Sequence, residues 1–156
     1  MSDKLYRVAY VSRSLLEGDD GTISDAIQNI LESARKNNAL ADITGALLFS
    51  GDYFGQVLEG EETALDELLK KLEQDPRHSE VSVLCFEPVE QRIFNGWAMA
   101  WTGPLKGKQS EVQGMLRSKD EIGVREQGLS LINMLDYLVN QQQGRENSVR
   151  QPAQAS

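Results

Sequence analysis

The spacing of apolar residues predicts strands and helices in the first two thirds of the chain. Short segments rich in apolar residues predict strands over residues 5–12, 43–50, 53–59, 80–87 and 93–102. Apolar residues recur instead at helical spacing over residues 23–34 and 65–72. The first strand carries apolar residues on both faces, which is typical of a strand in the middle of a sheet.

Polar residues mark the expected ends of these elements. Thr22 or Ser24 is expected to cap the first helix, because a side-chain oxygen there accepts a bond from a free backbone N–H. Asn37 and Asn38 are expected to end it, since asparagine tolerates the left-handed conformation found at helix ends. Residues 51–52 predict a tight turn, so the second and third strands should form a hairpin.

The order of these elements predicts an α+β fold. Strand, helix, strand, strand, helix, strand, strand (βαββαββ) describes a ferredoxin-like sandwich, with a five-stranded mixed sheet and both helices on one face. This unit is expected to span residues 1–103. Residues 104–141 are expected to be a helical extension that packs on the sheet or at an oligomer interface, with helices at 107–118 and 129–140. The polar tail 142–156 is expected to be disordered.

Composition and charge narrow the possible functions. The net charge of -8 repels phosphate backbones and makes a nucleic-acid binder a poor interpretation. One cysteine and one histidine cannot build a zinc site or a disulfide framework, so no metal is expected. No stretch approaches about 18 to 20 consecutive apolar residues, so we expect no membrane span. The N-terminus does not resemble a signal peptide, and we expect a cytoplasmic protein. The glycine-rich nucleotide loops GxGxxG and GxxxxGK[ST] are absent from the sequence.

Gln56 is the most informative polar residue. It alternates with Phe54 and Leu58, so its amide is expected to point into the core. A buried amide without partners costs about 1 to 3 kcal/mol, so a polar group must meet it. Either a structural hydrogen bond or a relay to a bound ring system satisfies this. If the first and third strands are neighbours, Tyr10 lies beside Gln56, and with Asn38 they suit a flat heterocycle with a polar edge.

Other chemically active residues have simpler interpretations. Cys85 lies within an apolar strand and reads as a buried structural thiol rather than a nucleophile. His78 follows a turn that contains proline. It is either a histidine at the surface, where the next strand begins, or a residue that contacts a ligand. Trp97 and Met99 share one parity of the fifth predicted strand with Trp101, as core residues do.

Five segments, in order, resemble the BLUF domains, which sense blue light using flavin. They are LYRVAYVS, ARKNNALADITGALLF, FGQVLEG, DPRH and FNGWAMAW, and the resemblance covers about residues 3–102. It implies a photoreceptor, not an enzyme, with a non-covalent flavin (usually FAD, with FMN possible) between the two helices. Gly55 stands where the family often has a bulkier residue, which suggests a locally looser strand. Trp101 is an extra aromatic residue without an assigned role.

The resemblance also implies roles for individual residues. Tyr10 is the electron and proton donor, and Gln56 links it to the polar edge of the flavin. Asn38 binds the carbonyl and imide edge, with Asn37 close by, and Lys71 lies near the other carbonyl. Further expected cofactor contacts are Ile27, Ile30, Leu58, Leu68, Asp75, Arg77 and His78.

Signalling is expected to leave the site through Trp97 and Met99, of which either could face the flavin. The output is a downstream partner protein, reached through the helices after residue 104, and a homo-oligomer is expected. At 156 residues, we expect no attached cyclase, phosphodiesterase or DNA-binding domain. The alternatives are a light-independent module that binds a small ligand, or an acylphosphatase-like hydrolase. The hydrolase needs an arginine in a phosphate-binding loop near the first strand, and the acidic stretch 17–21 is poor for that.

Overall fold

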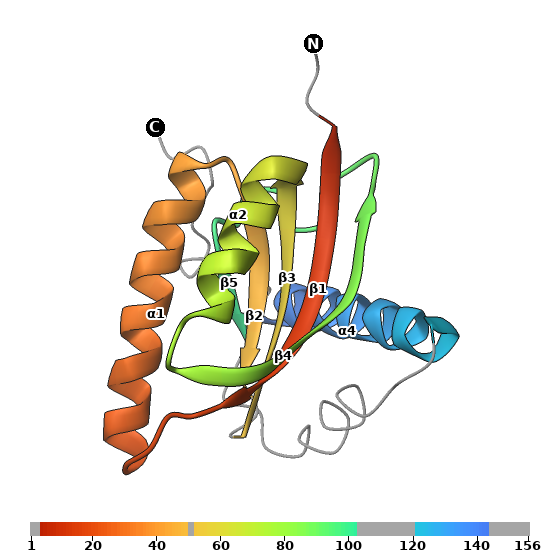
Figure 1. Cartoon of the computed structure of the whole chain (residues 1–156). Helices are drawn as coiled ribbons and strands as arrows, with labels where there is room; N and C mark the ends of the chain where they lie inside the picture. The colour runs from red at the N-terminus through yellow and green to blue at the C-terminus, as the bar shows by residue number, and fades with distance from the viewer. Residues whose placement is uncertain (1–3, 50–51, 103–120, 144–156) are drawn as a thin grey trace.

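A twisted sheet separates two helices from a third in the computed structural model, which describes residues 4–49, 52–102 and 121–143 (Figure 1). The elements are β1 (Leu5–Ser14), α1 (Asp20–Leu40), β2 (Thr44–Phe49), β3 (Tyr53–Glu61), α2 (Glu62–Glu73), β4 (His78–Pro88), β5 (Ala100–Thr102) and α4 (Glu121–Gln143). The predicted α+β class is confirmed.

The strands are arranged in the order β4-β1-β3-β2-β5. The pairs β4–β1, β1–β3 and β3–β2 are antiparallel, whereas the short β5 is parallel to β2. β1 has a neighbour on each side, as its two apolar faces predicted. The register places Tyr10 of β1 directly opposite Gln56 of β3.

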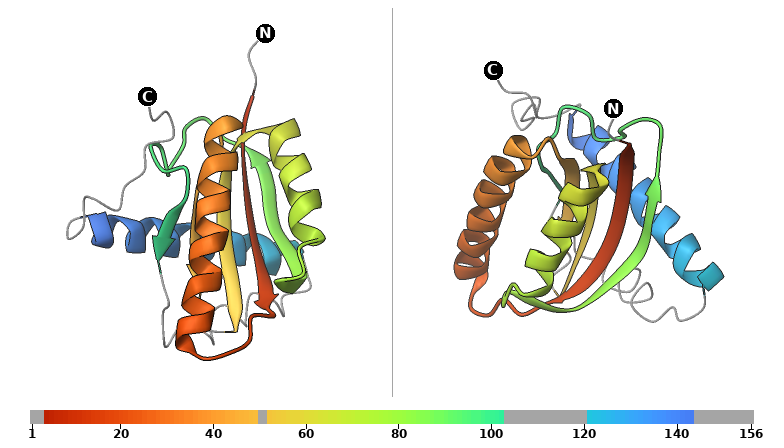
Figure 2. Two further views of the ribbon diagram at one scale, coloured as in Figure 1. Left: turned by 90° about the vertical axis from the view of Figure 1, so that its left-hand side faces the viewer. Right: turned by 45° about the horizontal axis from the view of Figure 1, so that its top comes forward.

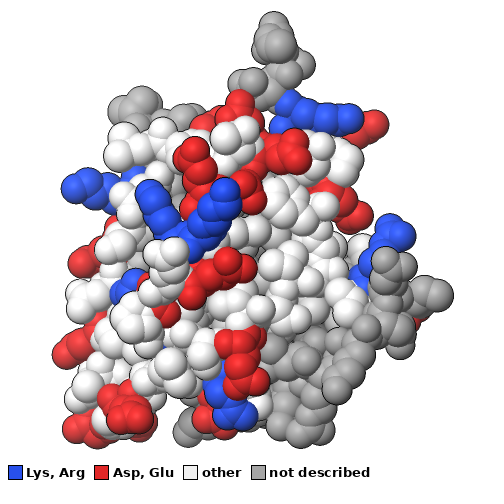
Figure 3. All heavy atoms as spheres, viewed as in Figure 1, with Lys and Arg blue, Asp and Glu red and all other residues white. Residues whose placement is uncertain are grey.

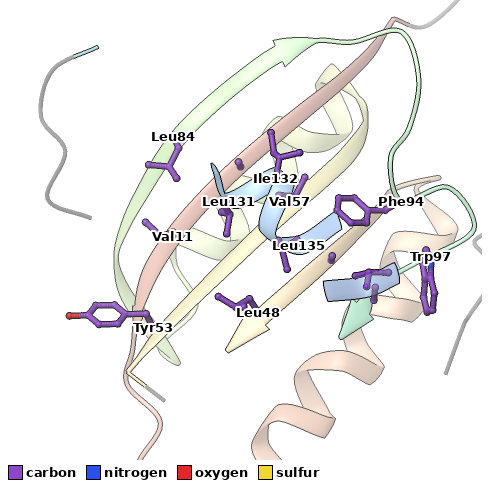
Figure 4. Packing of buried hydrophobic residues seen from close by; sticks show 14 residues of the cluster. Val11, Leu48, Tyr53, Val57, Leu84, Phe94, Trp97, Leu131, Ile132 and Leu135 are labelled. Carbon is purple, nitrogen blue, oxygen red and sulfur yellow. The ribbon is translucent and has the colours of Figure 1, made fainter. Parts of the chain in front are cut away.

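Each face of the sheet has its own hydrophobic core. Figure 2 shows α1 and α2 on one face, called here the α1–α2 face, and α4 running across the other, the α4 face. Side chains alternate between the faces because the strand period is two. The α1–α2 core includes Val8, Ile27, Leu31, Leu47, Phe54, Leu58, Leu65 and Met99. The α4 core includes Val11, Leu48, Val57, Leu84, Phe94, Trp97, Leu131, Ile132 and Leu135 (Figure 4).

The first helix begins earlier than predicted and ends close to the predicted point. Its cap is Asp19, whose carboxylate accepts the backbone N–H of Thr22 at 2.8 Å, so Thr22 and Ser24 both lie inside the helix. Aspartate is as good a cap as serine, and here it lies further upstream. The helix also continues past Asn37 and Asn38 to Leu40. Asn37 and Asn38 lie in its last turn, where their carbonyls accept the N–H of Ala41. The left-handed conformation expected of them falls on Asp42 instead, with a φ of +56°.

The fifth strand is much shorter than the predicted range 93–102. The backbone turns before it: the N–H of Trp97 donates to the carbonyl of Phe94 at 3.0 Å, and Gly96 adopts a φ of +90°. A turn resets the alternation of side chains, so the shared parity assigned to Trp97 and Met99 is wrong. Trp97 is buried on the α4 face and Met99 on the α1–α2 face.

The C-terminal part differs from the prediction mainly in its boundaries. α4 begins before the predicted range 129–140 and extends through residues 142–143, which had been placed in the disordered tail. The predicted helix 107–118 and the rest of the tail lie outside the described residues. Among the described helices, none combines the length and the apolar content needed to cross a membrane.

Candidate functional site

A cleft opens between α1 and α2, with the sheet as its floor. The empty space inside it, with the open solvent at its mouth included, is about 830 Å³. The space-filling view of this side shows basic and acidic side chains together over the region between the two helices (Figure 3). The lining residues are Tyr10, Ile30, Ser33, Ala34, Asn37, Asn38, Leu47, Phe54, Gln56, Leu68, Lys71, Leu72, Asp75, Arg77, His78 and Met99.

Tyr10 and Gln56 form the polar centre of the floor. Both side chains are buried, and the Tyr10 hydroxyl donates to the Oε1 atom of Gln56. Burial raises the pKa of Tyr10 well above its usual range, and the negative charge of Asp75 adds to this. The phenol is therefore protonated at neutral pH and serves as a donor.

This bond sets the orientation of the Gln56 amide. With Oε1 facing Tyr10, the Nε2 atom points the other way and donates to the sulfur of Met99 at 3.5 Å. A thioether is a weak acceptor, so the buried amide donor has room for a better partner in the cleft. The arrangement suits a ligand with an acceptor atom at this position.

The end of α1 forms a second polar wall. Asn38 is 2% exposed and its Nδ2 atom donates to the carbonyl of Ala98 at 2.9 Å. One turn earlier, the Nε atom of Arg35 donates to the carbonyl of Met99 at 3.1 Å. Burial lowers the pKa of Arg35. These two donors fix the backbone at residues 98–99 against the helix, and so hold the Met99 side chain near Gln56.

The segment after α2 closes the far end of the cleft. Arg77 donates to both carboxylate oxygens of Asp75, with a closest distance of 2.6 Å. This hydrogen bonding lowers the pKa of Asp75 and raises the pKa of Arg77. His78 joins β1 to α2, because its Nδ1 atom lies 2.8 Å from the Ser12 hydroxyl and its Nε2 atom contacts the Leu72 carbonyl. His78 thus has structural partners and also faces the cleft.

Most of the residues expected to contact a cofactor line this one cleft. Ile27 and Leu58 do not: both are buried in the α1–α2 core on the same face of the sheet, 4% and 0% exposed. Asn37 and Lys71 are exposed at its rim. Of the two candidates for facing the flavin, Met99 lines the cleft and Trp97 does not. The lining residues with no role predicted from the sequence are Ser33, Ala34, Leu47, Phe54 and Leu72.

Helical spacing would have found some of these residues. Ser33 and Ala34 lie one turn from Ile30 and Asn37, on the same side of α1, and Leu72 lies one turn beyond Leu68. Met99 has no such signal, because its position depends on the turn before β5.

The described geometry has counterparts in known proteins. The family model "BLUF: Sensors of blue-light using FAD" matches residues 5–100. The photoactivated adenylate cyclase subunit beta of Euglena longa is 38% identical over 65 residues, which are 42% of this chain and 8% of that protein. The blue light- and temperature-regulated antirepressor BluF of Escherichia coli is 40% identical over 68 residues, 44% of this chain and 17% of that protein. This chain thus covers less than a fifth of either curated relative.

A solved structure matches nearly the whole length. The dark-state structure of BlrB, described as a BLUF protein, has a TM-score of 0.66 and 27% sequence identity, covering 91% of this chain and 99% of that one. Because the family model matches well over half of the residues, this chain belongs to the BLUF family, the sensors of blue light using FAD.

Proposed function

We propose that this chain binds a flavin non-covalently in the cleft and signals blue light through the hydrogen bonds of Tyr10 and Gln56. The observation that carries the proposal is the buried bond from the Tyr10 hydroxyl to Gln56, made on the floor of the cleft. The strand order supports a ferredoxin-like sandwich as the scaffold for this site.

The residues of the cleft fit a flavin. Ile30, Ala34, Leu68 and Leu72 supply apolar helix surface for a flat ring. The Gln56 amide, whose partner at Nε2 is only a thioether, supplies a donor for a ring heteroatom. FAD is the ligand named for the family, and we propose it here, with FMN as the alternative to be tested.

The other contacts expected for the cofactor are proposed on the same basis. Asn38, with Asn37 close by, would bind the carbonyl and imide edge of the ring. Lys71 would lie near the other carbonyl, while the segment from Asp75 to His78 would close the site. Ile27 and Leu58 are instead proposed to pack behind the lining residues, in the core of the same face.

A bound flavin supplies the absorption of blue light and, once excited, accepts an electron. The protein supplies the proton path. Loss of an electron makes the Tyr10 phenol strongly acidic, so its proton moves along the existing hydrogen bond to Oε1 of Gln56. As Oε1 gains this proton, Nε2 would release one toward the cleft. When the electron returns, one proton would pass back through the amide to Tyr10, so the amide keeps its number of protons and no net redox change remains. The Gln56 amide is left rotated or tautomerised, with a different hydrogen-bond pattern toward the cleft.

The output is proposed to pass from Gln56 to Met99 and then to Trp97 and α4. Gln56 contacts Met99, and Trp97 belongs to the same core as Leu131 and Leu135 of α4. Moving a two-state equilibrium from 1:99 to 99:1 requires about 5.5 kcal/mol. One hydrogen bond contributes about 1 kcal/mol, so the change in α4 docking should be partial.

A partner protein or a second copy of the chain is proposed to amplify this change. The matched relatives are named as a photoactivated cyclase and an antirepressor, so light output through an effector is a precedent within the family. For this chain we propose a sensory role, not a catalytic one, in the cytoplasm. We propose residues 1–103 as the flavin-binding unit and residues 104–141 as the output extension.

The test is an absorption spectrum of the purified protein with FAD, before and after blue light. We expect a yellow protein with a small, reversible red shift. Tyr10→Phe should keep the colour and lose the shift. Tyr6→Phe is the matched control, because Tyr6 lies on the same face of β1 but does not line the cleft. A normal red shift in Tyr10→Phe would contradict the mechanism, and a protein that stays colourless with added FAD would contradict the function.

A further inference from the structure

The Glu59 carboxylate is buried on the α4 face of the sheet, where no charge is needed for packing. It is 0% exposed. Its partner ion is Arg7, whose Nε atom lies 2.8 Å from Oε2. The hydroxyl of Thr44 donates to Oε1 at 3.3 Å. These two partners are its register neighbours on β1 and β2, so the three side chains form one row across the sheet.

The remaining two donors come from the chain between β4 and β5. The backbone N–H of Ile93 donates to Oε2 at 2.8 Å, and the N–H of Phe94 donates to Oε1 at 2.9 Å. Arg7 adds a third contact to this region, because its Nη2 atom donates to the carbonyl of Gln91 at 2.9 Å. A buried charge requires such compensation, and here half of the donors are backbone groups of one loop.

This loop leads directly to the cleft. After the Glu59 contacts, Phe94 and Trp97 are buried on the α4 face (Figure 4). The carbonyl of Trp97 then accepts the N–H of Gly45 at 3.0 Å, at the edge of β2. Two residues later, Met99 lies on the other face, in contact with Gln56. Glu59 fixes the start of this crossing on one face, and Asn38 and Arg35 fix its end on the other.

We propose that Glu59 is a positioning residue for the photochemical site: it fixes residues 93–94 so that residues 97–99 present Met99 to Gln56. The inference rests on the proposed function, because the light response is one of its readouts. Glu59 does not touch the cleft. It acts through the loop, from the opposite face of the strand that carries Gln56.

The geometry requires a carboxylate at this position. Each oxygen accepts one backbone N–H, from Ile93 or from Phe94. In Glu59→Gln one of these N–H groups must face an NH2 group, whichever way the amide is turned. Glu59→Asp keeps both oxygens but withdraws them by about one C–C bond, roughly 1.5 Å. The proposal therefore predicts a larger effect for glutamine than for aspartate.

The experiment compares the wild-type chain, Glu59→Gln and Glu59→Asp, each with and without FAD. Leu65→Ala is the control for general destabilisation, since Leu65 is buried in α2 and does not line the cleft. Two readouts are needed. Amide hydrogen exchange over residues 93–100 in the flavin-free protein measures how firmly the loop is held. The red shift and the rate of its dark recovery measure the light response of the site.

We expect faster exchange over residues 93–100 in both Glu59 variants, but not in Leu65→Ala. Dark recovery should change about fivefold in Glu59→Gln, which corresponds to about 1 kcal/mol, and less in Glu59→Asp. If Glu59→Gln does not fold, the folded Glu59→Asp must show both effects. Unchanged exchange overturns the inference, and so does faster exchange with an unchanged light response, which would make Glu59 merely structural. If the wild type itself shows no red shift, the proposed function fails, and the inference with it.

Discussion

Leu131 of α4 packs directly on Gly55 of β3, and removing its side chain should weaken the docking of α4. Leu131 is 0% exposed. A Cβ atom added at Gly55 would lie 3.0 Å from Cδ1 of Leu131 and 3.4 Å from Cδ2 of Leu48. Leu131 thus occupies the space that a side chain at residue 55 would otherwise fill. Leu131→Ala leaves a cavity above a residue with no side chain of its own.

The expected magnitudes follow from this contact. Leucine-to-alanine changes at buried sites cost about 2 to 5 kcal/mol, and we expect the upper half of that range because Gly55 cannot fill the gap. Gly55→Ala alone should be close to neutral. Crowding against Leu131 costs about 1 kcal/mol, whereas replacing a glycine within a strand contributes about 0.5 to 1 kcal/mol. In the double variant the crowding is absent and the new methyl group fills part of the cavity, which contributes about 0.8 kcal/mol.

The double variant should therefore be about 1 to 2 kcal/mol more stable than Leu131→Ala alone. The assay is equilibrium urea unfolding followed by far-UV circular dichroism. It compares the wild type, Leu131→Ala, Gly55→Ala and the double variant at the same saturating FAD concentration. Leu135→Ala is the matched control: Leu135 is also 0% exposed, one turn further along α4, and is not among the nearest neighbours of a Cβ at residue 55. Adding Gly55→Ala should give Leu135→Ala no such gain. Equal effects of Gly55→Ala in both backgrounds would refute the reasoning.

Three further outcomes are expected. Asn38→Ala should weaken FAD binding and cost about 1 to 3 kcal/mol in unfolding free energy, because the Ala98 carbonyl loses its buried donor; calorimetric titration and urea unfolding measure the two effects. The pKa of Asp75 is lowered in the folded state by Arg77, so its contribution to stability is present above about pH 4 and is lost as the pH falls through the folded-state pKa. Asp75→Asn should thus lower the melting temperature at pH 7, with a difference from wild type that shrinks toward pH 3. Cys85, expected to be buried, is only partly so; this burial still raises the pKa of its thiol, and the negative charge of Glu87 adds to it. Its reaction with a disulfide reagent at pH 8 should therefore be slower in the native protein than in urea, and equal rates would show that the fold does not shield the thiol.

The floor of the site could be predicted from the sequence because it lies on regular strands. Alternation with a period of two placed Tyr10 and Gln56 on the same face of β1 and β3, and the observed register places them opposite each other. Glycine at residue 55 was expected to loosen β3. Instead the strand stays paired there, and the missing side chain makes room for Leu131.

The wall of the site formed by residues 97–99 could not be predicted in the same way. Its course depends on Glu59, which is 34 residues away in sequence from Ile93. No local pattern reports that a distant carboxylate accepts backbone donors, so the segment was read as a continuous strand with Trp97 and Met99 on one side. The same holds for Asn38, whose side chain donates to the carbonyl of Ala98, 60 residues away in sequence.

Gln56 and Glu59 lie on the same strand, β3, but their side chains point to opposite faces of the sheet, because they are an odd number of residues apart. A pleated strand sends residues an odd number apart to opposite sides, so an insertion or deletion of one residue between them would carry the carboxylate into the cleft or the amide out of it. Side chains at residues 57 and 58 can be exchanged for others of similar size without this effect. The residue types at positions 57 and 58 should therefore vary during evolution, whereas the number of residues between Gln56 and Glu59 should not. We expect substitutions there among descendants of this chain, but no insertion or deletion of a single residue.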